Sequence, residues 1–430
     1  MKNLIVFWYL VFAGMPAFAE CDATYDMMKA KYSNPEEHLL SLGKTKVPPD
    51  QFFVAQNLYE VVSKCGFLTE VQQVFAKTKF KEWQTEYYVK KAELIATSGG
   101  DLDRYVINKN ENQTIIDYIK KYGAEANRDV SSDIQRIRNL SKQNENKYKN
   151  SCSDVDNRKT ECGKILGTTR NQKDLDWCFA YTTADLYSCK IGRRVSATDV
   201  AFQVHAGHLN EPDVFSRGTS TIAAIDKMRQ VGVCLEADQP SDLAAMSLLE
   251  TYQKILQQNE RFRKVGARAI NCAILGKAFP RINVLDFGKI VESTDKNLLE
   301  ELNALACKKR YVVGADEAKQ VAKKDPADFL KNMNQLIDSQ KPFHISYEQA
   351  LLYDGPIIQK QNQETAYNHS SIIMGRRFNK EKNVCEYLIR NSYGPEHSEA
   401  MNIDHTQEEG HQWVNVEFLL ERANYISYFK

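Results

Sequence analysis

The sequence predicts an α+β protein, because two kinds of pattern follow one another along the chain. Up to about residue 340, segments such as SLLETYQKILQQ and ADFLKNMNQLIDS repeat apolar residues at the three- and four-residue spacing of amphipathic helices. From Lys341 the chain changes to short runs rich in β-branched and aromatic residues, namely KPFHISYEQ, HSSIIMGRRF and VCEYLIRNSYG. The last two runs predict an antiparallel hairpin around NKEKN, so we expect helices first and an antiparallel sheet afterwards.

Composition limits the classes of function. The chain has 430 residues, a formal net charge of +1, 43% hydrophobic residues and 26% charged residues. This is an ordinary globular balance with enough length for two or three domains. Because the charge is close to zero, nothing in it favours binding to nucleic acid or a stable association with a membrane surface.

The N-terminal third divides into two parts. Lys2, the apolar run from Leu4 to Phe12, and the small residues at 17 and 19 are typical of a secretory signal peptide spanning residues 1–19. The following residues, 20–150, predict a helical region, and the polar stretch 139–160 predicts an exposed linker. We therefore expect a secreted or periplasmic product whose helical region is either a propeptide or a permanent accessory domain.

Export makes the ten cysteines candidates for disulfides. If Cys178 is a free nucleophile, nine others remain, so one of them stays unpaired. Proximity in sequence suggests three pairs. These pairs are Cys21 with Cys65, Cys152 with Cys162, and Cys272 with Cys307.

The segment NQKDLDWCFAYTTADLYSCKIG carries the candidate nucleophile. Asp174 or Asp176 is expected to cap a helix whose first turn holds Cys178, and Gly192 is expected to end it. Backbone N–H groups at a helix N-terminus stabilise a thiolate, so we expect the pKa of Cys178 to be lowered. Gln172 places an uncharged amide donor six residues earlier, where it can hydrogen-bond an oxyanion.

The predicted hairpin brings a histidine and an asparagine together. With a turn centred on Lys380, paired residues have numbers that sum to about 760, which sets His369 opposite Asn391. Directly opposed residues have Cβ atoms about 5 Å apart, so the carboxamide can hydrogen-bond the imidazole. A histidine oriented in this way can take the proton of a cysteine thiol.

These segments resemble the papain-like cysteine peptidases. YNHSSIIMG is similar to that family's Asn/Asp-His-Ala-Val-x-x-x-Gly, IRNSYG is similar to its Lys-Asn-Ser-Trp-Gly, and Gln172 stands six residues before the cysteine as in the family. Two departures are Tyr393 in place of the tryptophan and the absence of a Cys-Gly pair before the nucleophile. The resemblance implies a two-lobed papain-like fold, a helical lobe with an antiparallel β-barrel-like lobe, over residues 151–430 with a helical insertion at about 241–335.

The resemblance also implies an exported endopeptidase that needs neither a metal nor an organic cofactor. Cys178 would attack the peptide carbonyl, Gln172 would hold the oxyanion, and His369 would carry the proton while Asn391 orients its ring. The stretch SRGTSTIAAIDKM is similar to a family segment whose paired glycines bond an extended polypeptide substrate, and Gly218 is one of that pair. Two alternatives stay open: a non-catalytic papain-fold binding protein, and an amidase or transglutaminase using the same Cys-His chemistry.

Overall fold

The structure, a computed structural model, divides the chain into two compact units. The N-terminal unit comprises residues 1–145 and 354–366, and the C-terminal unit comprises residues 146–353 and 367–430. Within them the structure describes residues 70–108, 112–173, 175–209, 217–242, 245–247, 249, 282, 298–312, 314, 317–352, 368–395 and 406–430. The predicted signal peptide lies outside these ranges. In the described part of the chain, every helix is too short or too polar to cross a membrane.

The described part of the N-terminal unit is mainly helical. Its elements are α5 (Glu70–Thr97), β1 (Val106–Asn108), β2 (Gln113–Thr114), α6 (Ile115–Glu125) and α7 (Ser131–Asn144). The long helix α5 packs against both α6 and α7. Thr114 begins α6 with a capping box, because its hydroxyl accepts the Asp117 N–H while the Asp117 carboxylate accepts the Thr114 N–H. Ile95, Ile119 and Ile137, one on each of these helices, are completely buried.

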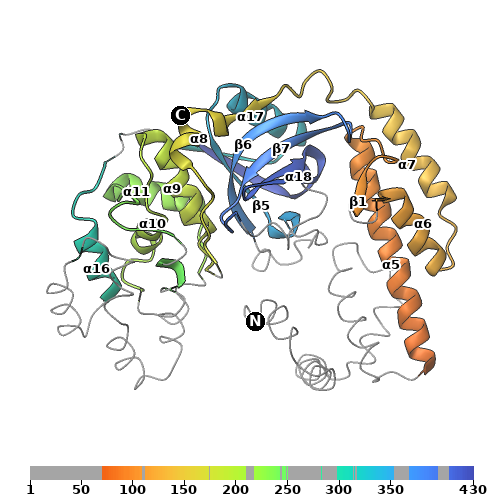
Figure 1. The fold of residues 1–430 in the computed structure, drawn as a ribbon, viewed down its shortest axis with the longest axis horizontal. Helices are drawn as coiled ribbons and strands as arrows, with labels where there is room; N and C mark the ends of the chain where they lie inside the picture. The colour runs from red at the N-terminus through yellow and green to blue at the C-terminus, as the bar shows by residue number, and fades with distance from the viewer. Residues whose placement is uncertain are drawn as a thin grey trace. The chain divides into compact units, whose positions relative to one another are not determined.

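The helices described in the C-terminal unit pack on the helix that begins at Cys178, on one another or on the sheet. They are α8 (Glu161–Leu166), α9 (Cys178–Ile191), α10 (Ala197–Val204), α11 (Thr221–Val231), α16 (Leu298–Ala306), α17 (Pro326–Asp338) and α18 (Val416–Arg422), with 3-10 turns η2 (Asn157–Lys159) and η4 (Gln349–Leu352). Helices α10 and α11 pack on α9, and α9 packs against the sheet (Figure 1). Trp177 and Phe179 at the start of α9 are fully buried in the core that these elements share with Ile372 and Leu388.

The C-terminal unit also contains an antiparallel sheet of eight strands. The strands are β3 (Val155–Asp156), β4 (Ala318–Ala322), β5 (Phe343–Glu348), β6 (Asn368–Asn379), β7 (Val384–Arg390), β8 (Thr406–Glu408), β9 (His411–Asn415) and β10 (Ala423–Phe429). Their order is β4-β10-β5-β6-β7-β9-β8, with β3 paired to β6 outside that path. Helices packed beside an antiparallel sheet confirm the α+β class that the sequence predicts.

Three local expectations are wrong. Strand β4 lies inside the stretch expected to be helical, because its backbone pairs with β10 at the edge of the sheet. The closing sequence GHQWVNVEFLLERANYISYF predicts an end strand, but the structure forms β9, α18 and β10 in succession. The stretch 139–160 is not simply an exposed linker, since α7 extends to Asn144, Tyr148 is buried and Cys152 is bonded to the sheet.

The disulfides differ from those suggested by proximity in sequence. The structure pairs Cys152 with Cys385, Cys162 with Cys189, and Cys234 with Cys307. The expected Cys152–Cys162 and Cys272–Cys307 pairs are therefore wrong, and Cys21–Cys65 lies outside the described residues. Partners separated by as many as 233 residues are neighbours only after the sheet has formed, so sequence distance does not identify them. Among the described residues Cys178 is the free cysteine.

Candidate active site

The candidate nucleophile is the first residue of helix α9. Trp177 is the residue that precedes the helix, and its side chain makes no capping hydrogen bond. The expectation that Asp176 caps the helix is therefore wrong, and Asp174 lies outside the described residues. Gly192 ends α9 in the left-handed region at φ 70°, which a residue without a Cβ adopts at low cost. The helix consequently presents Cys178 at its N-terminal end, with the first backbone N–H groups beside it.

The surroundings of the Cys178 sulfur have opposite effects on the pKa of its thiol. Burial raises the pKa of the thiol to about 11, and the Asp176 carboxylate acts in the same direction, while the nearby polar groups of Ser370 and the Phe179 backbone act to lower it. Burial outweighs these polar groups, so the expectation of a lowered pKa is wrong. The helix N-terminus alone does not set the titration of this thiol, because loss of hydration has the larger effect. Ser370 directly follows His369 on β6, so the nucleophile lies near the histidine strand here.

His369 and Asn391 are joined by a hydrogen bond of 2.8 Å between Nε2 and Oδ1. A carboxamide oxygen only accepts, so Nε2 carries the ring hydrogen and Nδ1 is the basic nitrogen of the neutral ring. The predicted register is wrong. Ile372 pairs with Arg390 and Phe378 with Cys385, which gives sums of 762 and 763 in place of 760. The hydrogen bond forms nevertheless, because Asn391 lies just beyond the last residue of β7.

The pairing of β6 departs from a simple hairpin at the turn and again within the strand. The pairing of β6 with β7 is irregular between Ile373 and Gly375. A Cβ added at Gly375 would lie 2.7 Å from the Val155 carbonyl oxygen, so only glycine lets β3 approach β6 this closely. The turn covers four residues rather than a single centre, which moves the sum to 763 beside the turn, and the irregularity in β6 then changes it to 762.

The imidazole of His369 is enclosed by aromatic rings. Its residue is 2% exposed, and burial lowers the pKa of the imidazole to about 4 although the Asn391 hydrogen bond acts to raise it. Tyr393 stacks on the ring with centroids 5.1 Å apart, and its hydroxyl lies 3.4 Å from Nδ1. Gln349 donates to the same hydroxyl at 2.7 Å, which holds the tyrosine in place. Tyr347 contacts the ring edge-on from β5. The histidine is therefore kept neutral in a dry, well-fixed position.

Gln172 is held rigidly beside the asparagine segment. Its backbone N–H donates to the Ser392 carbonyl at 2.7 Å, and its side-chain oxygen accepts the Ser392 hydroxyl. Its side-chain nitrogen donates to the Leu175 carbonyl at 2.6 Å. An amide nitrogen carries two hydrogens, and this bond uses one of them. The second can serve a developing oxyanion without any change in the position of the side chain.

Gly218 lies beside the loop that leads into the nucleophile helix. A Cβ added at this position would be 3.7 Å from the Asp176 carbonyl oxygen, and the residue is exposed. The exposed backbone of this segment is therefore near Cys178 and can offer hydrogen bonds to an extended chain. Arg217, the residue before it, is half-buried.

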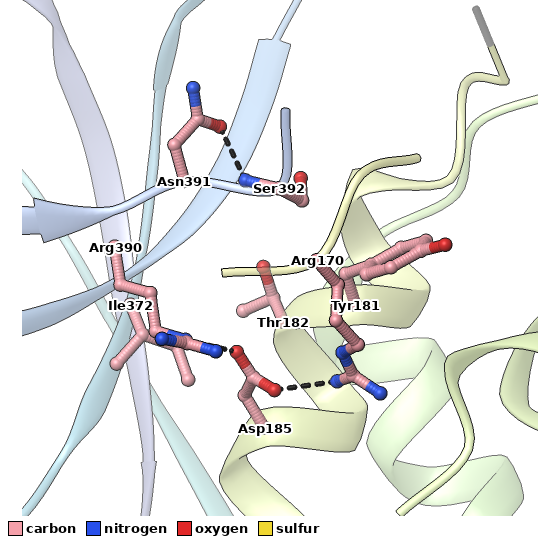
Figure 2. Close-up of a pocket in the computed structure, with 8 residues that line it drawn as sticks. All are labelled: Arg170, Tyr181, Thr182, Asp185, Ile372, Arg390, Asn391 and Ser392. Carbon is pink, nitrogen blue, oxygen red and sulfur yellow. Dashed lines mark hydrogen bonds and ion pairs between the residues drawn. The ribbon is translucent and has the colours of Figure 1, made fainter. Parts of the chain in front are cut away.

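A buried group of charges fastens the three segments of the site together. Asp185, two turns along α9 from Cys178, accepts from Arg170 at 2.5 Å and from Arg390 at 2.8 Å. Figure 2 shows its carboxylate between the two guanidinium groups, in a small pocket between α9 and the sheet. Arg170 also bonds Glu236 at 2.8 Å. Arg170 lies two residues before Gln172, and Arg390 precedes Asn391, so Asp185 ties both segments to the nucleophile helix.

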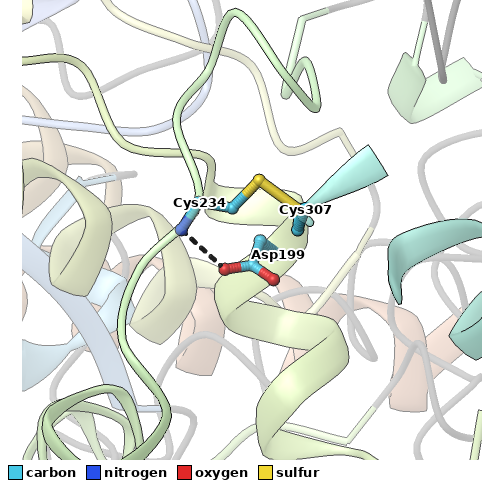
Figure 3. Close-up of side chains that lie close together, drawn as sticks. All are labelled: Asp199, Cys234 and Cys307. Atoms are coloured by element: carbon cyan, nitrogen blue, oxygen red, sulfur yellow. Dashed lines mark hydrogen bonds between the residues drawn. A yellow bond between two sulfur atoms is a disulfide. The ribbon is translucent and has the colours of Figure 1, made fainter. Parts of the chain in front are cut away.

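Asp199, Cys234 and Cys307 form a second close cluster (Figure 3). The two sulfurs are bonded to each other, and the carboxylate accepts from Arg310 at 2.7 Å and from the Cys234 N–H at 3.1 Å. Oxidised sulfurs are not thiolate ligands, so this cluster is a structural disulfide beside a buried ion pair. The sequence Ser196-Ala-Thr-Asp199 predicts a capping box at the start of a helix. Ser196 does cap α10, but Asp199 does not return a bond to it because its carboxylate serves these partners.

Searches against known protein families and against curated proteins give no match. Solved structures give matches at low identity. A digestive procathepsin L 3 from Tenebrio molitor larval midgut is 9% identical, covers 88% of this chain and 98% of its own, and has a TM-score of 0.36. Procathepsin B S9 from Trypanosoma congolense is 11% identical over 65% and 77% of the two chains, with a TM-score of 0.37. Bromelain protease from Ananas comosus, in complex with the E64 inhibitor, is 13% identical over 65% and 98%, with a TM-score of 0.35. These similarities are low, so the functional proposal rests on the geometry of the site.

Proposed function

We propose that the chain is an exported papain-like cysteine peptidase. The observation that carries this proposal is the 2.8 Å bond between His369 and Asn391, on a strand whose next residue, Ser370, lies near enough to Cys178 to act on the pKa of its thiol. Gln172 supplies an amide donor fixed beside the same segment. A nucleophile, a base, a group that orients the base and an oxyanion donor are the four parts that acyl transfer through a thiol requires.

The reaction follows from the direction of these hydrogen bonds. Because Nε2 donates to Asn391, Nδ1 of His369 takes the proton of the Cys178 thiol, and the sulfur attacks the peptide carbonyl carbon. The second Gln172 amide hydrogen and the Cys178 backbone N–H receive the negative oxygen. His369 then gives its proton to the leaving amine, and water releases the acyl group from sulfur with His369 again acting as base. Gly218 offers its backbone to the polypeptide substrate.

The pKa values of Cys178 and His369 indicate the charge of the site before substrate binds. Burial raises the pKa of Cys178 to about 11 and lowers the pKa of His369 to about 4, so both groups are neutral before substrate arrives. The charge separation then accompanies the attack, where the Gln172 amide and the helix N-terminus can stabilise it. This order differs from a preformed thiolate and imidazolium.

Covalent labelling tests the proposal. The purified chain without its signal peptide would be treated with an epoxysuccinyl cysteine-peptidase inhibitor and mapped by mass spectrometry, both intact and after limited proteolysis. We expect stoichiometric modification at Cys178 that is lost in His369→Ala. The disulfide-bonded cysteines serve as the internal control, since they should remain unmodified. Absence of labelling in both forms would contradict the proposal.

One observation favours a second candidate, a binding protein on the same scaffold. A neutral buried imidazole and a neutral thiol are also compatible with a site that performs no chemistry. The labelling experiment separates the two, because a binding protein retains a thiol of ordinary reactivity that does not depend on His369. An amidase or transglutaminase would label at Cys178 and would be separated by its products.

We further propose that residues 20–150 act as an intramolecular propeptide of an exported enzyme. The three disulfides of the C-terminal unit support export to an oxidising compartment. The Cys152–Cys385 disulfide sharpens the test, since only cleavage before Cys152 frees the N-terminal unit without reduction. We expect incubation at mildly acidic pH to release that fragment on a non-reducing gel. A stable, active, full-length enzyme would show that the region is a permanent domain.

A further inference from the structure

The imidazole of His369 is hydrogen-bonded at both of its nitrogens. Nε2 lies 2.8 Å from Asn391 Oδ1, and Nδ1 lies 3.4 Å from the hydroxyl of Tyr393. Gln349 donates from its side-chain nitrogen to the same hydroxyl at 2.7 Å. His369 and Tyr393 are only 2% and 8% exposed, so water has little access to the bond between them. A series of hydrogen bonds therefore runs from Asn391 through the imidazole to Gln349.

The direction of donation in this series is fixed at the asparagine end. Asn391 Oδ1 also accepts the backbone N–H of Ser392 at 2.8 Å, a bond that is drawn in Figure 2. Because a backbone N–H only donates, the Asn391 atom that receives it is the carboxamide oxygen, and His369 Nε2 must donate to the same atom. Nδ1 of the neutral ring then has a lone pair and no hydrogen, so the Tyr393 hydroxyl donates to Nδ1.

Gln349 donates in the same direction at the other end of the series. Its amide N–H occupies one lone pair of the Tyr393 oxygen, which leaves the hydroxyl hydrogen to point to Nδ1. If Gln349 accepted this hydrogen instead, two lone pairs would face each other between the hydroxyl and the ring. Gln349 is the first residue of η4 and directly follows β5, which pairs with β6 so that Tyr347 lies opposite His369. The sheet therefore places this amide close to the histidine.

We propose that Gln349 and Tyr393 are positioning residues that, together with Asn391, select the tautomer of His369 in which Nδ1 is the basic nitrogen. The inference rests on the proposed peptidase function, in which Nδ1 takes the proton of Cys178. Asn391 alone holds the ring at one nitrogen, whereas a second directed bond holds it at both. When the thiol proton reaches Nδ1, the Tyr393 hydroxyl turns its hydrogen away and accepts from the imidazolium.

This arrangement has a measurable consequence for the titration of the ring. A hydrogen bond donated to the Nδ1 lone pair stabilises the neutral imidazole, so removing that bond should raise the pKa of His369. The other titratable groups on the neighbouring elements are unchanged in every variant below. These groups are Tyr347, His344 and Glu348 on β5, Cys178 on α9 and Tyr425 on β10.

Nuclear magnetic resonance of the chain with its histidines labelled in heavy nitrogen tests the tautomer and the titration together, with His369→Gln to assign the signals. In the wild type we expect the ring hydrogen on Nε2 at neutral pH and a pKa of about 4. Tyr393→Phe keeps the stacked ring and removes the donor, so the pKa of His369 should rise by roughly half to one unit. Its effect on peptide hydrolysis should be roughly 2- to 5-fold in kcat, with KM unchanged.

Gln349→Glu should reverse the direction of the series, because a carboxylate only accepts. The Tyr393 hydroxyl would then donate to the new carboxylate and turn a lone pair toward Nδ1, which raises the pKa of His369 by about 1 unit or more. The added charge acts on the ring as well, so Gln349→Glu combined with Tyr393→Phe measures the effect of charge without the hydroxyl. The rise caused by glutamate should be smaller in that background. Gln320→Glu, on the exposed edge strand β4, is the control for a distant added carboxylate and should leave the pKa of His369 unchanged.

Two results would overturn the inference. One is a wild-type ring that carries its hydrogen on Nδ1, and the other is a titration of His369 that is unchanged in both Tyr393→Phe and Gln349→Glu. Gln349→Met, which has similar length and no donor, replaces the glutamate variant if that variant does not fold, and it should raise the pKa by less than Tyr393→Phe does. The ring measurement uses no substrate. If the expected tautomer and shifts occur in a chain that neither labels at Cys178 nor cleaves peptides, the peptidase proposal is overturned and the selection of the tautomer is supported.

Discussion

Helix α9 carries two buried ionisable side chains about two turns apart, and they are stabilised in opposite ways. Asp185 stays charged. Burial alone would raise its pKa, but Arg390 and Arg170 hold the pKa of the carboxyl below its usual value. Cys178 stays neutral, because the pKa of its thiol rises to about 11 and the groups that act to lower it are uncharged. The charged site is a structural clamp, and the neutral site is left free to change its charge.

The contrast between Asp185 and Cys178 shows why a catalytic group is not simply paired with a permanent opposite charge. A buried ion pair is costly to break, so its members keep their protonation state over a wide range of pH. A buried neutral pair such as Cys178 and His369 changes its protonation state when a new interaction offsets the free energy of separating charge. We therefore expect substitutions near Cys178 to change the rate of catalysis, whereas substitutions near Asp185 should change the free energy of unfolding.

The largest effect should follow from removing the nucleophile. Cys178→Ala is expected to reduce kcat by about 10⁴-fold or more, the scale found when one member of a catalytic unit is lost. Because the side chain is small and neutral, the melting temperature should stay within about 5 °C of wild type. Peptide hydrolysis and thermal unfolding followed by circular dichroism measure the two effects. A large loss of stability with retained activity would reverse the roles assigned to the two sites.

Removing the charge of the clamp should give the next largest effect, this time on stability. Asp185→Asn keeps the shape but leaves Arg170 and Arg390 without their shared carboxylate. We expect unfolding free energy to fall by about 3–5 kcal/mol, the cost of an unpaired buried charge. A matched control is Asp226→Asn, whose partner Arg229 is half-exposed and whose loss should cost less than about 1 kcal/mol. Equal effects in urea denaturation would contradict the clamp.

A neutral buried histidine should make the fold sensitive to acid. His344 is fully buried without a hydrogen bond to either ring nitrogen, and burial lowers the pKa of the ring to about 3. As the pH falls, this histidine therefore binds a proton in the unfolded chain before it does so in the folded chain. Its contribution to the free energy of unfolding is complete above about pH 6.5 and is lost as the pH falls. At pH 4 this group should account for about 3 kcal/mol of lost stability. His344→Phe should flatten the acid slope of unfolding free energy, and an unchanged slope would contradict the assignment.

The smallest effect is expected at the ring that covers the histidine. Tyr393→Phe keeps the stacking on His369 and removes the hydroxyl that lies 3.4 Å from Nδ1. Because Asn391 still holds the ring, we expect kcat to change by roughly 2- to 5-fold, which corresponds to one weak hydrogen bond. A fall beyond about 100-fold would show that this hydroxyl takes part in proton transfer. Steady-state kinetics of the variant and the wild type decide between these outcomes.

Local features of the fold could be predicted because their signals are local. Ser196 at the start of α10 and Gly192 at the end of α9 act as the sequence predicts, and the change from helical to strand-like pattern at Lys341 precedes β5. Strand β4 was missed because its five residues alternate only weakly and depend on β10 for pairing. Disulfide partners and the exact hairpin register depend on neighbours that the fold supplies, so sequence spacing did not identify them.

The site shows the same division between local and long-range information. Order and local similarity pointed to Gln172, Cys178, His369 and Asn391. The Asp185 clamp was missed because its partners lie in three separate segments, although an Arg immediately before Asn391 is a usable signal. The direction of the Cys178 pKa was wrong because burial, which decides it, cannot be read from a helix N-terminus.

The most direct test of peptide-bond cleavage at this site is the hydrolysis of a denatured protein in water enriched in heavy oxygen. The processed wild-type chain and Cys178→Ala would be compared. If the site cleaves peptide bonds, mass spectrometry should find new C-termini carrying heavy oxygen with the wild-type chain and none with the variant. Amide or cross-linked products would indicate a different acyl acceptor. If a folded and processed chain with an unmodified Cys178 thiol produced no new termini, the proposed peptidase function would be contradicted.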